Sequence, residues 1–344
     1  MSNKTIAVVI LNWNGINFLK QFLSSFAQHS AVEGFDSSIV VVDNGSTDNS
    51  VKWIRSEFPS VRLIVLDKNY GFTGGYNIAL KQVSADYYVI VNSDVKVDRG
   101  WLNPLVNFLE ENPKAAACQP KILSFNEPHK FEYAGASGGF VDFLGYPFCR
   151  GRILSVTEED KGQYDNTHRV FWATGACMVI KSKAFWEVGG FDTNFFAHME
   201  EIDLCWRLNR LGYSIWVVPQ SSVLHVGGGT LPNNNPFKVY LNHRNNLLML
   251  HKNLFGARLF LTLSFRMVLD LASSVLYALS GNFSFTLSVY KAHFYFLKSL
   301  KRNAYKKSKC KENTKSKTFL YPYCILFQYF ICKKRMYFQL PKTE

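Results

Sequence analysis

Residues 38–50 read SIVVVDNGSTDNS, a run of valines followed by a carboxylate and a turn-forming glycine. A continuously apolar run is typical of a strand that is covered on both faces of a sheet. The run stops at Asp43, Gly45 permits a tight turn, and Ser50–Glu57 has helical spacing with Asp48 or Ser50 as its cap. Strand, turn and helix in this order are the repeating unit of an α/β fold.

The same unit recurs along the N-terminal part of the chain. Apolar, β-branched runs occupy Ile6–Leu11, Arg62–Leu66 and Tyr87–Val91, and Asn17–Gln28 has the periodicity of a helix. Strands that alternate with helices pair in parallel through right-handed crossovers. We therefore expect a Rossmann-like, mostly parallel sheet flanked by helices.

Each apolar run gives way to Asp or Asn, at Asn12, Asp43, Asn69 and Asn92–Asp94. In such sheets the ligand binds at the carboxyl ends of the strands. Loops with a purely structural role would also be polar, but repeated Asp and Asn at one edge favours a binding site.

The middle of the chain is less regular. Residues 127–166 are rich in Gly, Pro and aromatic residues, which indicates a loop-rich insert over this edge. Phe171–Ile180 is predicted to be a strand, Glu200–Leu211 a helix that ends before Gly212, and Ser214–Val218 a strand that Pro219 stops.

After residue 235 the pattern becomes helical and apolar, so we divide the chain into an α/β domain (1–235) and a C-terminal helical region (236–344). Residues 259–280 are about long enough to span a bilayer, but Arg266 and Asp270 lie among them. We expect an interfacial, amphipathic helix; a helical subdomain packed on the protein is the alternative.

The net charge of +13 is concentrated at the C-terminus. Residues 291–344 contain fourteen Lys and Arg against two acids, so the rest of the chain is nearly neutral. A basic tail interleaved with aromatic residues suits an anionic membrane surface, although a solvated tail would have the same composition. We expect no nucleic-acid partner.

Seven cysteines without a CxxC pair predict buried free thiols in a reducing compartment.

The N-terminal apolar run ends at Asn12, and this run is too short to be a signal peptide. We therefore expect a cytoplasmic protein, peripheral on the inner face of the cell membrane.

Several of these residues can carry chemistry. A carboxylate at a strand end, such as Asp94, can hold Mg²⁺ or Mn²⁺ that bridges a diphosphate. The glycines of residues 69–77 permit close approach of a ligand to the backbone. Glu201 lies in the first turn of its helix and can point into a cleft, and His225 can be a metal ligand. Taken singly, each also has an ordinary structural interpretation as a turn, cap or helix-dipole residue.

Taken together, these pieces resemble family 2 glycosyltransferases with the GT-A fold, in the rhamnosyltransferase-like branch that builds bacterial surface polysaccharides. The resemblance covers most of residues 5–230. It is carried by VVILNWNG (8–15), VVDNGSTDNS (41–50), NYGFTGGYN (69–77), VNSDVKV (91–97), TGACMVIKSKAFWEVGGFD (174–192), MEEIDLCWRLNRLGY (199–213) and VLHVGGGT (223–230).

The resemblance implies a nucleotide-diphosphate sugar as donor and a glycan or lipid-linked glycan as acceptor. It implies a metal site at Asp94 and His225, with Asn92 in place of the first Asp of the family's DxD motif. The residues implied to contact the donor are Asn12, Asp43, Asn69, Gly71, Gly75, Asn77 and Asn92.

The resemblance also implies a catalytic base in the family's E-D-x-D-L pattern, which reads Glu200-Glu201-Ile202-Asp203-Leu204 here. Glu201 occupies the position of the base, with Glu200 as the second candidate. Gly175 and Ala176 would border the sugar. The implied reaction is a single in-line displacement at the anomeric carbon with inversion.

Three other functions are compatible with parts of the sequence. A nucleotidyltransferase would show a basic, Gly-rich phosphate loop near its N-terminus, and the segment Asn12–Gly15 contains no Lys or Arg. A dinucleotide-dependent oxidoreductase would show GxGxxG after its first strand. A non-catalytic lipid- or nucleic-acid-binding protein would use the basic tail alone.

Overall fold

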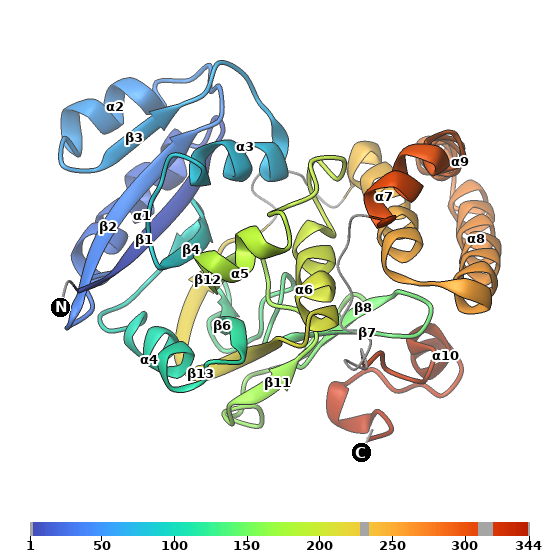
Figure 1. Ribbon diagram of the computed structural model, residues 1–344. Coiled ribbons are helices and arrows are strands. Elements are labelled where there is room, and N and C mark those ends of the chain that lie inside the picture. The colour runs from blue at the N-terminus through green and yellow to red at the C-terminus, as the bar shows by residue number, and fades with distance from the viewer. Residues whose placement is uncertain (1–2, 228–233, 309–318, 343–344) are drawn as a thin grey trace.

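The structure is a computed structural model that describes residues 3–227, 234–308 and 319–342 (Figure 1). Within this part of the chain, the centre is a nine-stranded sheet in the order β11-β13-β6-β12-β4-β1-β2-β3, with β5 paired to β13. Its strands are β1 (Lys4–Asn12), β2 (Phe35–Asp43), β3 (Arg62–Val65), β4 (Tyr87–Asn92), β5 (Val95–Lys96), β6 (Ala115–Ser124), β11 (His168–Val170), β12 (Cys177–Lys181) and β13 (Ser214–His225).

The predicted parallel sheet is formed by the N-terminal strands. β1 pairs in parallel with β2 and β4, and β2 pairs in parallel with β3. The other half is mixed, because β12 runs antiparallel to both β4 and β6 while β13 runs parallel to β6. The sheet thus continues beyond the parallel strands without a break.

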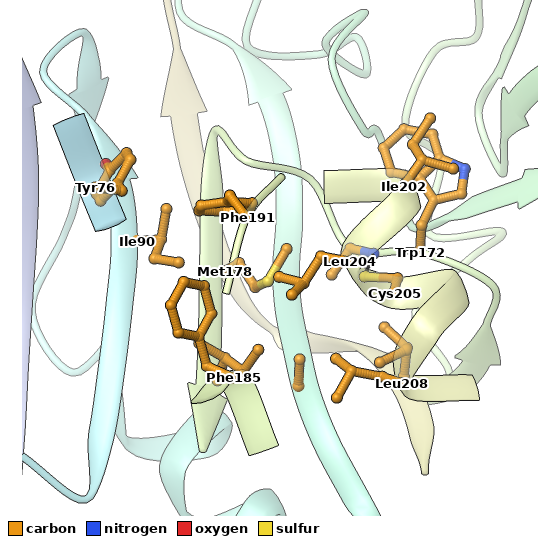
Figure 2. Packing of buried hydrophobic residues seen from close by; sticks show 14 of the residues in the cluster. Tyr76, Ile90, Trp172, Met178, Phe185, Phe191, Ile202, Leu204, Cys205 and Leu208 are labelled. Atoms are coloured by element: carbon orange, nitrogen blue, oxygen red, sulfur yellow. Dashed lines mark hydrogen bonds between the residues drawn. The ribbon is translucent and has the colours of Figure 1, made fainter. Parts of the chain in front are cut away.

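Helices cover both faces of the sheet. α1 (Ile16–His29), α2 (Ser50–Glu57) and α4 (Asn103–Glu111) pack on one face, and α3 (Gly71–Leu80), α5 (Ser182–Glu187) and α6 (Glu200–Arg210) pack on the other. Successive strand residues point to opposite faces of the sheet. Val8 therefore packs in the first core, under α1, α2 and α4, and Val9 packs in the second core, under α3, α5 and α6. Figure 2 shows the second core, where Ile90 of β4 and Met178 of β12 meet Phe185 of α5 and Leu204 of α6.

Two strand predictions were wrong in extent. The predicted strand Phe171–Ile180 is interrupted, because Thr174 leaves the ladder: its backbone N–H donates to Oε1 of Gln119 and its hydroxyl to the carbonyl of Ala134. Pro219 does not stop the strand that contains it. β13 continues to His225, and its register shifts between Val217 and Ser222, so the proline sits at an irregularity where no ladder donor is needed.

The insert at residues 127–166 contains a small second sheet in addition to loops. Its strands are β7 (Gly139–Val141), β8 (Pro147–Cys149), β9 (Arg152–Ile153) and β10 (Val156–Thr157). The end of the chain, with α10 (Ile325–Phe330) and the 3₁₀ turn Tyr337–Gln339, packs against it (Figure 1). This contact buries Phe148, Ile153, Tyr321, Ile325 and Leu340.

The predicted C-terminal helices are α7 (Pro236–Asn253), α8 (Gly256–Leu279) and α9 (Phe283–Ser308), which gather on one side of the sheet domain (Figure 1). The six described cysteines are free thiols, four of them buried. Cys310, the basic residues of 309–318, and Gly228 and Gly229 lie outside the described residues.

Candidate active site

The predicted ligand edge is formed by the ends of β1, β2 and β4. Asn12 pairs in register with Asp43, and Asn92 with Leu11, because parallel strands end at the same edge. Nδ2 of Asn12 donates to Oδ2 of Asp43 over 3.0 Å, and the N–H of Ser46 donates to Oδ1 of the same carboxylate. Oδ1 of Asn12 is buried with no hydrogen-bond partner in the described chain, and this leaves an acceptor for a ligand.

Asn44, which the sequence analysis did not single out, organises the next loop. Its Nδ2 donates to Oδ1 of Asn69 and to the carbonyl of Gly71, and its Oδ1 accepts the N–H of Tyr70. Oδ1 of Asn69 also accepts the N–H of Gly71. Asn69 is therefore held by the loop itself, and what it can offer a ligand is its amide nitrogen.

The glycines of residues 69–77 lie in the first half of a helix, α3. Gly71 begins α3 with φ +70°, and a Cβ there would lie 2.5 Å from the ring of Phe196. A Cβ at Gly75 would lie 2.8 Å from Leu11, so this glycine permits close packing of α3 on β1. The amide of Asn77 exchanges two hydrogen bonds with the backbone of Phe191. The described contacts of Gly75 and Asn77 are thus internal, and their contact with the donor stays a prediction.

Asp94 and His225 are brought together from distant parts of the chain. Oδ1 of Asp94 lies 3.1 Å from Nε2 of His225, and Nδ2 of Asn92 lies 3.5 Å from the same nitrogen. The other ring nitrogen, Nδ1, lies 3.1 Å from Oε2 of Glu132 in the insert. Burial lowers the pKa of His225, but the two carboxylates outweigh burial and raise it to about 10.

This pair suits a divalent cation that displaces the proton of His225, because a metal-binding imidazole must be neutral. No group of three or more His, Cys, Asp or Glu side chains is preassembled for a metal in the described residues. However, two ligands that each lie about 2.1 Å from an octahedral ion are about 3.0 Å apart, close to the separation of Asp94 and His225. A carboxylate on the second nitrogen of a metal-binding histidine is also a common supporting arrangement.

The segment 174–176 connects this pair to the start of α6. The N–H of Asn92 donates to the carbonyl of Ala176 over 3.1 Å. A Cβ at Gly175 would contact the ring of Phe72 at 3.1 Å and Cβ of Glu201 at 3.9 Å. Gly175 and Ala176 therefore lie between Asn92, whose amide is beside His225, and Glu201, and any larger residue at 175 would crowd this space.

The two glutamates at the start of α6 have incomplete hydrogen bonding. Glu200 is buried and Glu201 partly exposed, and each has a buried Oε2 without a partner in the described chain. Burial raises the pKa of both carboxyls, and the charge of Glu201 raises that of Glu200 further. The pKa of Glu201 is raised to about 7, so this carboxyl can take up or release a proton near neutral pH.

Asp203, on the same helix, has a different role. Its oxygens accept hydrogen bonds from Arg207, Lys252 and Asn253. The predicted Asp203–Arg207 pair is thus confirmed, and Lys252 and Asn253 connect it to α7. These charge pairs hold the pKa of Asp203 below its usual range despite burial.

Comparison with known proteins connects this geometry with a family. Residues 7–189, more than half of the chain, match the family described as Glycosyl transferase family 2. The chain belongs to this family. This family 2 glycosyltransferase is an enzyme of the hexosyltransferase class, and the assignment displaces the nucleotidyltransferase, oxidoreductase and non-catalytic alternatives.

Characterised relatives of this glycosyltransferase act in glycan assembly. It is 28% identical over 238 residues to the N-acetylglucosaminyl-diphospho-decaprenol L-rhamnosyltransferase of Mycobacterium tuberculosis. The aligned region covers 64% of this chain and 75% of that relative. It is also 28% identical over 193 residues to the O-antigen biosynthesis protein RfbC of Myxococcus xanthus. Here the aligned region covers 54% of this chain and 15% of that protein.

Solved structures show the same GT-A fold. The structure of GalNAc-T7 with UDP, GalNAc and Mn²⁺ matches with a TM-score of 0.57 at 15% identity, over 72% of this chain and 48% of the other. The mannosyltransferase PcManGT of Pyrobaculum calidifontis, in complex with GDP-Man and Mn²⁺, matches with a TM-score of 0.50 at 15% identity, over 91% and 89%. The fold class predicted from the sequence is therefore confirmed.

Proposed function

We propose that this glycosyltransferase moves rhamnose or a similar hexose from a nucleotide-diphosphate donor to a lipid-linked glycan, with inversion, in the synthesis of a surface polysaccharide. The observation that supports the proposal is that residues 174–176 contact Asn92 at one end and Glu201 at the other, while the amide of Asn92 lies beside the Asp94–His225 pair. One end of this arrangement suits a cation and the other a base.

The donor contacts follow from the free polar atoms at the sheet edge. Asn12 and Asp43 hold the base and ribose, since Oδ1 of Asn12 is buried and has no partner among the described residues. Asn69 and Gly71 lie along the nucleotide. Asp94 and His225 would hold Mg²⁺ or Mn²⁺, with Asn92 beside them, and the bound ion would supply positive charge against the diphosphate leaving group.

Glu201 acts on the acceptor. With its carboxylate ionised, it accepts the proton of the acceptor hydroxyl as that oxygen attacks the anomeric carbon. Gly175 and Ala176 leave room for the sugar, because they have almost no side chain. Glu200 is the second candidate for the base.

Membrane attachment is supported by the faces of α8. Its buried residues are Thr262, Arg266, Asp270 and Ser274, a polar stripe with a spacing of four. Arg266 and Asp270 pair at 2.8 Å, and His243 and His293 contact Asp270 from α7 and α9. The charges that argued against lipid contact therefore point inward and are paired.

The outward faces of α8 and α9 are apolar. α8 is also long and apolar enough to cross a membrane by length and composition, as the one such helix in the described chain. A helix of a soluble protein normally buries its apolar stripe and exposes its polar residues. In α8 the buried stripe is polar and the exposed residues are mostly apolar. We propose that this face rests on the cytoplasmic side of the cell membrane. Its exposed residues are Phe260, Leu261, Phe265, Val268, Leu271, Val275, Leu276 and Leu279 on α8, and Phe283, Leu287, Tyr290, Phe294 and Leu297 on α9.

A donor screen tests the transfer function. The purified protein is incubated with a panel of nucleotide sugars, with and without Mn²⁺, and release of the nucleoside diphosphate is measured. We expect one donor class to be hydrolysed slowly, and faster with Mn²⁺. Absence of hydrolysis and of binding across the panel would contradict the proposal.

A further inference from the structure

A pocket of about 610 Å³ lies between α7 and α9, and none of the candidate active-site residues lines it. Tyr240 of α7 and Tyr295 of α9 line it, together with Lys291, Lys298 and Arg302. The three cations are seven and four residues apart, so they lie on one face of α9. The pocket thus combines aromatic surface with clustered positive charge.

The positive charge of this pocket is not neutralised by any carboxylate of the residues that the structure describes. In the described chain, no carboxylate forms an ion pair with Lys291, Lys298 or Arg302. The sequence between residues 254 and 308 contains a single acid, Asp270, and that residue is buried among Arg266 and two histidines. An anion would therefore meet three cations without a competing negative charge.

The aromatic part of the pocket is held in place by cations. The rings of Tyr240 and Tyr295 meet edge to face at 6.5 Å, and the guanidinium of Arg244 lies 5.1 Å from both ring centres. Nη2 of Arg302 donates to the hydroxyl of Tyr295 over 2.6 Å. These contacts fix Arg302 at the pocket before any ligand binds, which lowers the entropy cost of binding.

The surroundings of the pocket suit a ligand with an apolar chain. Phe294, which lines the pocket, is 69% exposed, and it continues into the apolar face of α8 and α9. On the other side, Tyr240 stacks on Phe237, and Phe237 contacts Phe196, which packs against Gly71 at the start of α3. The pocket therefore lies between the apolar face and the candidate active site.

We infer that this pocket binds the phosphate or diphosphate headgroup of a lipid whose chains lie along the apolar face of α8 and α9. The inference rests on the proposed membrane attachment but not on the transfer chemistry. The headgroup can belong to an anionic phospholipid or to a lipid-linked acceptor, and both present the same phosphate chemistry to Lys291, Lys298 and Arg302.

The test compares two charge-matched double variants. K298Q/R302Q removes two cations from the pocket, and R258Q/K301Q removes two exposed cations of α8 and α9 that do not line it. Partitioning is measured at physiological salt on phosphatidylcholine vesicles that are neutral, contain phosphatidylglycerol, or contain a prenyl diphosphate at the same surface charge. Donor hydrolysis by both variants checks the fold and the transfer site separately.

We expect K298Q/R302Q to reduce partitioning on anionic vesicles by about thirtyfold, the effect of two basic residues at a membrane surface, and R258Q/K301Q to reduce it by less than about fivefold. Preference of the wild type for prenyl diphosphate would assign the headgroup to the acceptor, and equal partitioning on both anionic vesicles would assign it to phospholipid. Equal losses in the two variants, or no loss in K298Q/R302Q, would overturn the inference.

Discussion

The carboxylates of α6 differ in how fully their oxygens are bonded. Asp203 receives hydrogen bonds from Arg207, Lys252 and Asn253, so proton uptake there would cost several favourable contacts. Glu200 and Glu201 each keep a buried oxygen without a partner in the described chain. A proton-accepting role is thus available to the glutamates and not to Asp203, although all three lie in one short stretch of sequence.

Glu201→Gln should reduce the rate of sugar transfer by about 10²- to 10⁴-fold, the usual contribution of a general base. The size of the side chain is kept, so binding of the donor nucleotide should change little. Transfer is measured with radiolabelled donor, and nucleotide binding by calorimetry. Glu200→Gln is the matched control: loss of transfer in that variant, with Glu201→Gln still active, would move the base to Glu200.

The pH dependence of transfer should show the raised pKa of Glu201. Because burial favours the protonated carboxyl, the base is inactive at low pH and becomes active as pH rises through a pKa above the ordinary glutamate value. The acidic limb of the kcat profile measures this pKa. An acidic limb at the pKa of an exposed glutamate would contradict the assignment.

Glu132 illustrates a residue that acts through another. Its Oε2 lies 3.1 Å from Nδ1 of His225 and also accepts the N–H of Ala134. Glu132→Gln should weaken Mn²⁺ binding by about 10- to 100-fold, as expected when a supporting carboxylate is lost. Electron paramagnetic resonance titration of Mn²⁺ without donor measures this affinity.

The control for this change is Glu127→Gln, which alters an exposed glutamate of the same insert that pairs with Lys130. Its Mn²⁺ affinity should stay at the wild-type value. Unchanged affinity in Glu132→Gln would show that Glu132 does not support the cation site.

Among the secondary-structure elements, α7 holds the backbone segment that leads into α6. Phe196, His198 and Met199 all have positive φ, a strained conformation for such residues. Nδ2 of Asn245 on α7 lies within hydrogen-bond distance of the carbonyls of Phe195, Ala197 and His198. The helical region thus holds the segment that leads into Glu200 and Glu201, and α7 functions with the sheet domain even though the proposed domain boundary precedes it.

Asn245→Ala should lower the free energy of unfolding by about 1–3 kcal/mol, since buried carbonyls lose their donor. It should also lower kcat by about tenfold or more, because small displacements of a catalytic group are costly. Urea unfolding and transfer assays measure the two effects.

Asn246→Ala provides the comparison, since Asn246 is equally buried but donates to Gly145 in the insert. Its stability should fall while kcat stays near the wild-type value. Equal losses of kcat in the two variants would show that the effect is general destabilisation.

On the scale of the whole molecule, the sheet domain carries the candidate site and the helical region carries the apolar face. The sheet edge supplies Asn12, Asp43 and Asp94, and α6 supplies Glu201. The helical region turns a polar stripe inward and an apolar face outward, beside the candidate site (Figure 1). An enzyme that uses a soluble donor and a membrane-bound acceptor needs its donor-binding edge and its membrane-contacting face next to each other on the molecule.

Phe260→Ser combined with Phe265→Ser should reduce partitioning into anionic vesicles by about a hundredfold, since burying each phenylalanine contributes at least about 1.5 kcal/mol. Both side chains are mostly exposed, so the fold should survive. Vesicle flotation measures the change. Val65→Ser, an exposed apolar substitution at the far edge of the sheet, should leave partitioning unchanged. Equal flotation of all forms would reject the membrane face.

Local patterns of sequence were enough to predict the parallel half of the sheet, the edge formed by Asn12, Asp43 and Asn92, and the family. Strand and helix periodicity act over a few residues, and parallel strands always end at one edge. The break in the strand at Thr174 was missed, because its hydrogen-bond partners Gln119 and Ala134 are far away in the sequence.

Tertiary structure alone decided which distant side chains meet. It placed Glu132 beside His225, Asn245 beneath the start of α6, and the polar stripe of α8 toward the protein. The contacts of Glu132 and Asn245 have no local signal, and the four-residue spacing of the α8 stripe does not tell whether the stripe faces the protein or its surroundings. Their roles depend on the packing of surfaces that belong to separate parts of the chain, and that packing exists only in the folded molecule.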